Sequence, residues 1–290
     1  MAAFTVCSRP AGQGEANPSS VPILFTSPHS GTVLPETMLA DLRVPLMDLR
    51  RTEDAFVDEL FSSVPETGAK LVFANYSRTY VDLNRDAREL DPAMFLDGPP
   101  RKVAVPTPRV EAGLGCLPRI AAGGEPIYAT RLSRAEGEYR LAHVHDTYHE
   151  YVRRTLEAYR REAGIAVLID CHSMPSKQPG RRKLADIVLG DRFGSSCDNR
   201  LTSLAERTLR DFGYTVSRNA PYAGGYTTRC YGRPHRGVHA LQIEINRKLY
   251  MNERDISRTA NFGSVKKDMQ ALSRILTAFA RRLASSASVA

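Results

Sequence analysis

Cysteine is scarce in this chain, and its placement excludes two classes of protein. The five cysteines, Cys7, Cys116, Cys171, Cys197 and Cys230, are odd in number, widely scattered and free of any CxxC pair. A disulfide framework needs paired cysteines, and a thiolate zinc site needs closely spaced ones. We therefore expect reduced thiols, without a disulfide framework and without a cysteine zinc site.

Long hydrophobic runs are also missing. No stretch approaches the ~20 apolar residues of a membrane-spanning helix, and the residues before and after Arg9 lack the apolar core and cleavage pattern of a secretory signal. These absences predict a cytoplasmic protein that has no membrane partner.

Motifs for nucleotides and nucleic acids are absent as well. Neither GxGxxG nor GxxxxGK[ST] occurs in the sequence. The net charge of +8 would suit nucleic acid, but the Lys and Arg residues are dispersed, and no zinc-finger spacing or RNA-reading aromatic motif accompanies them. We expect no nucleic-acid partner, and a pocket for a small acidic substrate explains part of the charge.

The composition is that of a globular α/β protein. Of the 290 residues, 42% are apolar and 25% charged. Residues 1–20 are polar and rich in Gly, Pro and Ser, which predicts a flexible arm. No linker divides the remainder, so residues 21–285 are predicted to form a single domain. Residues 91–127 are rich in Pro and Gly without periodicity, which predicts a flap over a site.

Alternating strand and helix patterns predict the α/β class. Apolar runs indicate strands that begin at Val21, Lys70, Ala166, Asp186 and Val238. Apolar residues spaced three and four apart predict helices at residues 136–163, 201–212 and 265–283, and a broken helical pattern covers residues 46–61.

Two of the apolar runs end in a histidine. The run from Ala166 stops at His172, and the run from Val21 leads to His29, which a Ser-Gly turn follows. In open α/β sheets, ligands bind at the carboxyl ends of the strands. The pair predicts a metal or catalytic cluster, whereas a satisfied structural histidine is the alternative for either residue alone.

A carboxylate stands inside a third strand. From Val238 onward, alternation sends Leu241 and Ile243 to one face and Gln242 and Glu244 to the other. Burying an unpaired carboxylate is costly, so Glu244 is expected to meet a metal, a cation or a substrate.

Other polar clusters have two interpretations each. Arg78 and Arg85, with Asn84 beside the second, form either a solvated surface strand or an anion clamp. Glu53 and Asp54 either cap a helix or serve the site.

The remaining clusters lie on a helix and in a turn. His145 and His149, one helical turn apart, either bind a metal or pack. The turn at Gly224 and Gly225 is too short for a nucleotide loop and suggests the backbone wall of a small pocket.

Five ordered motifs together resemble one family. They are Pro28-His-Ser-Gly31, Tyr80-Val-Asp-Leu-Asn-Arg-Asp86, Ile169-Asp-Cys-His-Ser-Met174, Gly224-Gly-Tyr-Thr-Thr-Arg229 and Gly237-Val-His-Ala-Leu-Gln-Ile-Glu244. From Val21 to Met251 the sequence resembles the N-formylglutamate amidohydrolases and, distantly, the zinc carboxypeptidases and aspartoacylase. The resemblance implies a three-layer α/β sandwich with a central mixed sheet, of the zinc-carboxypeptidase type.

The resemblance also implies roles for individual residues. His29 and His172 would bind one Zn²⁺ ion, Glu244 would be the general base, and Arg78 would face the oxyanion. The carboxypeptidase-like relatives have a carboxylate three residues after the first His, but Thr32 stands there. Asp54 is therefore the implied third ligand, with Glu53 as the fallback.

The resemblance implies that Asn84 and Arg85 hold the substrate's α-carboxylate. The turn with Gly225 and Tyr226 is expected to line the pocket, and Arg229, which follows that turn, is the candidate for binding a side-chain carboxylate.

The activity implied by the resemblance is zinc-dependent hydrolysis of a linear amide. The substrate would be an N-formyl or other N-acyl acidic amino acid, split into the free amino acid and formate or another carboxylate, as in amino-acid catabolism and histidine degradation. The alternatives are a zinc deacylase or carboxypeptidase-type hydrolase of another substrate, or a noncatalytic binding protein that keeps the fold. The sequence leaves the oligomeric state open.

Overall fold

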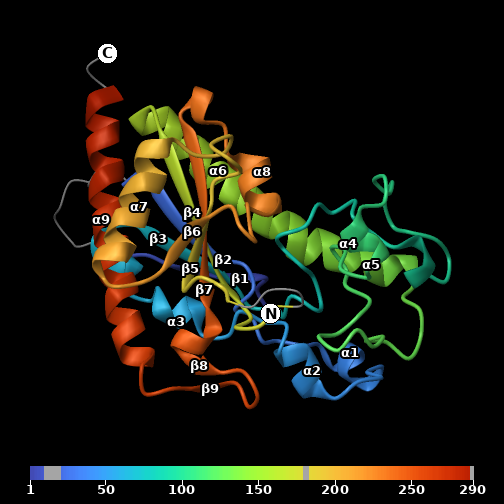
Figure 1. Ribbon diagram of the computed structural model, residues 1–290. Coiled ribbons are helices and arrows are strands. Elements are labelled where there is room, and N and C mark those ends of the chain that lie inside the picture. Colours follow the sequence, from blue (N-terminus) through green and yellow to red (C-terminus); the bar gives the residue numbers. More distant parts are fainter. Residues whose placement is uncertain (10–20, 179–182, 288–290) are drawn as a thin grey trace.

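The computed structural model describes residues 1–9, 21–178 and 183–287 (Figure 1). Its strands are β1 (Phe4–Cys7), β2 (Ile23–Ser27), β3 (Lys70–Ala74), β4 (Ala166–Met174), β5 (Ile187–Gly190), β6 (Val216–Arg218), β7 (Val238–Asn246), β8 (Met251–Asn252) and β9 (Ser257–Arg258). Its α-helices are α1 (Glu36–Ala40), α2 (Leu46–Arg50), α3 (Val57–Leu60), α4 (Pro108–Glu111), α5 (Arg134–Arg140), α6 (Thr147–Ala163), α7 (Asn199–Asp211), α8 (Tyr226–Tyr231) and α9 (Phe262–Ala287). A π-helix spans Leu141–Asp146, and short 3-10 helices span Val64–Thr67, Pro92–Met94, Pro234–Arg236 and Arg247–Leu249.

One mixed sheet organises the fold. Within the described residues its strand order is β1-β3-β2-β4-β7-β5-β6. The central strands β3, β2, β4 and β7 run parallel, whereas β1 is antiparallel to β3, and β5 is antiparallel to β7. All nine residues of β4 are buried, which explains the apolar run over its first four residues, 166–169.

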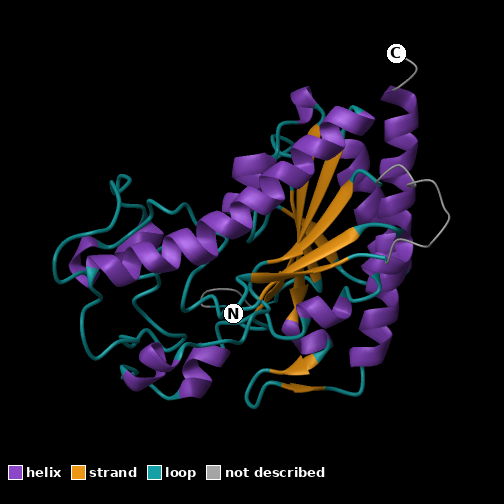
Figure 2. Ribbon diagram, turned by 180° about the vertical axis from the view of Figure 1, so that it is seen from behind, coloured by secondary structure: helices purple, strands orange, loops and turns teal. Residues whose placement is uncertain are grey.

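Helices cover both faces of this sheet (Figures 1 and 2). Val167 of β4 faces a core that α3, α7 and α9 complete, and its neighbour Leu168 faces a second core against α6. The prediction of a three-layer α/β sandwich with a central mixed sheet is confirmed. None of the helices in the described part of the chain combines the length and the apolar composition that crossing a membrane requires.

The predicted helix at residues 136–163 forms, with one irregularity. It consists of α5, the π-helix and α6 in direct succession, and its first half projects beyond the sheet (Figure 2). Residues 91–127 pack around this projecting half and bury Met94, Phe95 and Ile127 in the second core. These contacts hold most of that segment in place next to the carboxyl ends of the strands.

Two predictions about the first sixty residues need correction. Residues 4–7, expected in a flexible arm, form the edge strand β1 because Phe4 packs against the rings of Tyr148 and Tyr151. Residues 10–20 of that arm lie outside the described residues. The interrupted pattern at residues 46–61 becomes α2 and α3, and the N-cap of α3 is Phe56 at a φ of 67°. The capping role considered for Glu53 and Asp54 is therefore wrong.

Candidate active site

The carboxyl ends of the central parallel strands carry the polar side chains. His29 follows the end of β2 by two residues, and His172 lies near the end of β4. Glu244 of β7 is the register partner of His172 across the parallel pair. The fold therefore brings three residues that are far apart in sequence to one edge of the sheet.

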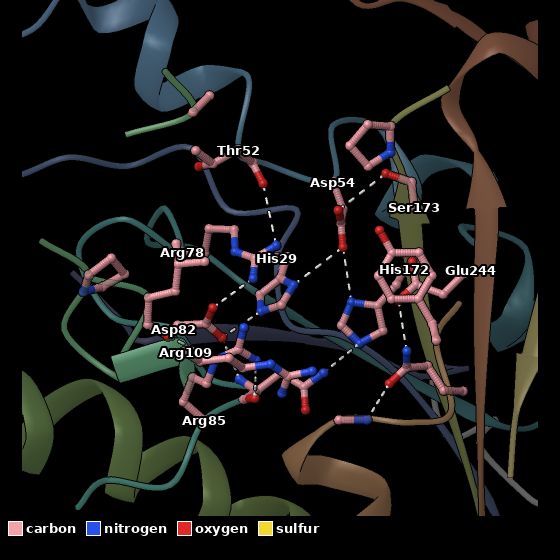
Figure 3. A pocket seen from close by; sticks show the side chains of 18 of the residues that line it. His29, Thr52, Asp54, Arg78, Asp82, Arg85, Arg109, His172, Ser173 and Glu244 are labelled. Atoms are coloured by element: carbon pink, nitrogen blue, oxygen red, sulfur yellow. Dashed lines mark hydrogen bonds and ion pairs between the residues drawn. The ribbon is translucent and has the colours of Figure 1, made fainter. Parts of the chain in front are cut away.

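A cluster of possible metal ligands occupies this edge. His29, Asp54 and His172 are all buried, and one ligand atom of each lies within 4.8 Å of the others. Oδ2 of Asp54 is 2.9 Å from Nδ1 of His172 and 3.3 Å from Nδ1 of His29 (Figure 3). The buried Nδ1 atom of His29 has no hydrogen-bond partner among the described residues. Two imidazoles and a carboxylate, with one imidazole nitrogen buried and lacking a hydrogen-bond partner in the described part of the chain, fit a divalent metal ion.

The other nitrogen of each imidazole is held by a second carboxylate. Nε2 of His29 lies 2.7 Å from Asp82, and Nε2 of His172 lies 2.9 Å from Asp170. Each Nε2–H therefore donates to an acceptor, which leaves Nδ1 as the ligand atom. Asp170 and Asp54 raise the pKa of His172 well above its ordinary value despite its burial, so the site favours positive charge.

Asp54 is fixed in place by Arg247, which follows β7 directly. The guanidinium donates to Oδ1 of Asp54 at 3.1 Å, to the carbonyl of Glu53 at 2.6 Å and to Oγ of Ser173 at 3.1 Å. Burial alone would raise the pKa of Asp54, but its contacts with the imidazoles of His172 and His29 hold it well below its ordinary value. Asp54 is thus an anion with a defined orientation.

Glu53, the fallback ligand, turns away from the cluster. Its buried carboxylate accepts a hydrogen bond of 2.7 Å from Nε of Arg50. Burial raises the pKa of Glu53 to about 7, since only part of the desolvation is offset by Arg50. Of these two neighbouring acids, only Asp54 lies in the cluster.

Glu244 has the surroundings of a general base. Its side chain faces the pocket while the residue is only 6% exposed, and Nε2 of Gln242 donates to Oε1 at 2.7 Å. The amide of Gly225 in turn donates to Oε1 of Gln242 at 2.8 Å. Burial raises the pKa of Glu244 to about 8, and the charge of His172 works against that rise. A carboxylate with a pKa near neutrality suits proton transfer at physiological pH.

A cavity of about 520 Å³ opens in front of these residues. The cluster, Glu244 and the backbone of residues 223–225 line it, and residues 91–127 contribute Arg109, Leu114 and Ile120. Figure 3 shows the imidazoles, the carboxylates and three of the arginines turned toward one another around this space. The volume is suited to a small polar molecule.

The segment after β3 supplies arginines and an amide. Nη2 of Arg78 donates to Asp82 at 2.7 Å. Among the described residues, Arg85 donates only to backbone carbonyls, those of Asn84 at 2.8 Å and Leu114 at 3.1 Å. Its remaining N–H groups are available for an anion in the cavity.

Asn84 is buried in the wall of the cavity. Its Oδ1 accepts hydrogen bonds from the amide and the hydroxyl of Thr227 at 2.8 and 3.0 Å. A Cβ atom on Gly225 would collide with the Asn84 carboxamide, so the glycine is required for space. Asn84 and Gly225 are therefore brought together as one surface of the pocket.

The comparisons with known proteins agree with this geometry. Residues 21–251 match the family model of N-formylglutamate amidohydrolase. The chain is 34% identical over 240 residues to a protein named N-formylglutamate deformylase from Pseudomonas aeruginosa. The aligned region covers 80% of this chain and 83% of that one. The chain belongs to the N-formylglutamate amidohydrolase family.

Further relatives share both sequence and fold. A protein named N-formylglutamate deformylase from Pseudomonas putida is 31% identical over 238 residues, which are 80% of this chain and 83% of that one. The crystal structure of N-formylglutamate amidohydrolase from Ralstonia eutropha superposes with a TM-score of 0.89 at 34% identity, and it covers 97% of this chain and 99% of that one. The family predicted from the five motifs is confirmed.

Two residues that were predicted to contact the substrate do not lie at the cavity. Tyr226 and Arg229 are absent from the described residues that line it. Arg229 lies on α8 with a half-exposed side chain 3.5 Å from Glu89. Because α8 begins at Tyr226, its helical path carries these side chains away from the wall that Gly225 forms.

His145 and His149 have a structural role that the sequence left open. Nε2 of His145 donates to the carbonyl of Arg85, and Nε2 of His149 donates to the carbonyl of Leu83, each at 2.9 Å. The two imidazoles thus hold the backbone on either side of Asn84. Of the two interpretations, packing is what the structure shows, and the metal cluster lies elsewhere.

Several residues of the site had escaped the sequence argument. Asp170 precedes His172 by two positions, so the period of a strand puts both on one face, as the alternation around Glu244 had already done for Gln242. The same signal could have found Asp170. Arg247 carried no comparable signal, because its contact with Asp54 spans 193 positions.

Proposed function

We propose that the protein hydrolyses the formyl amide of N-formylglutamate to glutamate and formate. Family membership supports the reaction, and two relatives carry the name N-formylglutamate deformylase. The observation that carries the proposal is the convergence in one cavity of a buried His-Asp-His cluster, a buried carboxylate and guanidiniums free to bind an anion.

The ion held by His29, Asp54 and His172 is proposed to be Zn²⁺. Two nitrogen donors and one carboxylate are a usual ligand set of hydrolytic zinc sites, and the cluster borders the cavity. When bound, such an ion supplies a Lewis acid that polarises a carbonyl and acidifies a water molecule.

The chain's own residues perform the proton transfers and the positioning. Glu244 takes a proton from the attacking water and returns it to the nitrogen of the leaving glutamate. Arg78, held by Asp82, faces the negative charge that develops on the formyl oxygen. Arg85, beside Asn84, binds the α-carboxylate of the substrate through its planar guanidinium.

The rival functions make different use of the same residues. A noncatalytic binding protein has no need of a buried Glu244 beside the cluster, and this family member retains His29, His172 and Glu244 together. A deacylase or carboxypeptidase-type hydrolase would use the same cluster on a different acyl group, so the substrate must be tested directly.

The deciding experiment combines metal analysis with a formate-release assay. Purified protein should contain about one equivalent of a divalent ion, and N-formylglutamate should yield formate and glutamate in equal amounts. N-acetylglutamate and C-terminal dipeptides serve as comparison substrates. Faster turnover of either comparison substrate would replace the deformylase proposal with the corresponding rival. The cytoplasmic location and the action of residues 91–127 as a flap stay predictions.

A further inference from the structure

The arginines of the cavity differ in how their charge is compensated. Five line it, namely Arg51, Arg78, Arg85, Arg109 and Arg247. Three of them have carboxylate partners: Arg51 pairs with Asp48, Arg78 with Asp82 and Arg247 with Asp54. Within residues 1–9, 21–178 and 183–287, neither Arg85 nor Arg109 forms an ion pair. Two guanidiniums that have no ion-pair partner within these ranges therefore face the cavity.

These two arginines are tied together through Leu114. The carbonyl of Leu114 accepts a hydrogen bond of 3.1 Å from Nε of Arg85, and the amide of Leu114 donates to the carbonyl of Arg109 at 2.7 Å. Figure 3 places both guanidiniums on the same side of the cavity, across from Glu244. Burial lowers the pKa of Arg85, the charge of Asp82 works against this shift, and the charges of Arg78 and Arg109 lower the pKa further.

The position of Arg109 is built into the fold. It lies on α4, whose N-cap Thr107 accepts a hydrogen bond from the amide of Val110, and Val110 is buried. The Arg109 side chain itself is exposed. The helix is thus anchored on one side and presents a solvated guanidinium to the cavity on the other.

We propose that Arg109 binds the side-chain carboxylate of the substrate while Arg85 binds its α-carboxylate, an inference that rests on the proposed function. N-formylglutamate is a dianion, and two guanidiniums on one side of the cavity, neither of them in an ion pair with a described residue, match its two carboxylates. The bound substrate relieves the repulsion between the guanidiniums. Arg109 therefore takes the role that the sequence had suggested for Arg229.

A substrate pair separates the two carboxylates. kcat/KM is measured for the wild type and for Arg109→Gln with N-formylglutamate and with N-formylglutamine, whose side chain is uncharged. Arg109→Gln should lower the value for N-formylglutamate about 10- to 100-fold, a moderate effect because Arg109 is exposed. For N-formylglutamine the change should stay below about threefold, because the lost contact does not exist there. Arg131→Gln, an exposed arginine outside the cavity lining, removes the same charge and should change neither value.

Each outcome has a distinct meaning. An equal loss with both substrates would overturn the assignment to the side-chain carboxylate, and so would an unchanged value for N-formylglutamate. A wild type that releases formate from neither substrate would instead overturn the proposed function. Thermal melting of Arg109→Gln, expected at the wild-type temperature, separates a lost contact from a damaged fold.

Discussion

Nδ1 of His172 lies 2.9 Å from Oδ2 of Asp54, although 118 positions separate the two residues. Nδ1 of His29 approaches the same oxygen to 3.3 Å. A carboxylate holds Nε2 on the opposite side of each imidazole. The two Nδ1 atoms and Oδ2 of Asp54 therefore point toward a common centre. This convergence is the basis of the first prediction.

Removing a cluster residue should remove the metal. His29→Ala, His172→Ala and Asp54→Ala should each lose most of the single equivalent of divalent ion, measured by elemental analysis of dialysed protein, because three ligands hold it. Glu53→Gln is the matched control and should keep the ion, since Glu53 bonds Arg50 instead. Full metal content in both histidine variants would show that the proposed centre is wrong.

Glu244→Gln should separate chemistry from metal binding. The amide keeps the shape of the side chain but cannot accept the proton, so kcat should fall by about 10²-fold or more. Metal content and the melting temperature should stay at the wild-type values. Full activity in this variant would remove Glu244 from the mechanism.

Gln242→Leu should shift the pH profile. Nε2 of Gln242 donates to the Glu244 carboxylate at 2.7 Å, and this bond stabilises the charged form and lowers its pKa. Without the bond the pKa of Glu244 rises, so the base becomes protonated at a higher pH. The acid limb of the kcat/KM profile should therefore move to higher pH. A limb that stayed in place or moved downward would contradict this account of Gln242.

Arg85→Lys tests the contact with the α-carboxylate. A lysine reproduces the planar fork of a guanidinium poorly, so kcat/KM should fall by about 30-fold or more. Amidation of the substrate's α-carboxylate should cause a similar loss in the wild type. The two losses should not add, because both changes break the same contact. Fully additive losses would mean that Arg85 and the α-carboxylate act separately.

Gly225→Ala tests the wall of the pocket. The added methyl group would collide with the Asn84 carboxamide, so kcat/KM should fall by about 10- to 100-fold through displacement of the substrate site. Gly263→Ala is the control, because in the described part of the chain no atom beyond its neighbours and its own helix backbone lies within 4 Å of a methyl group there. Wild-type activity in Gly225→Ala would show that the wall can shift without cost.

The sequence by itself determined those features that depend on local periodicity. The apolar run before His172 placed it at the end of a buried strand, and the alternation around Glu244 turned that carboxylate to the face opposite Leu241. Both follow from the two-residue period of a strand, which requires no knowledge of distant contacts. The order of the five motifs then sufficed to identify the family, and the helix-strand pattern sufficed for the α/β class.

Only the tertiary structure decided which of two adjacent acids lies in the metal cluster and which of two arginines lines the cavity. Asp54 and Glu53 are adjacent, and their assignment depended on Arg247, a partner from a distant strand end. The choice of Arg109 over Arg229 depended on how residues 91–127 cross the cavity and on where α8 begins. Loops and helix starts have no short repeat that sets the direction of a side chain, so the direction follows from long-range packing alone.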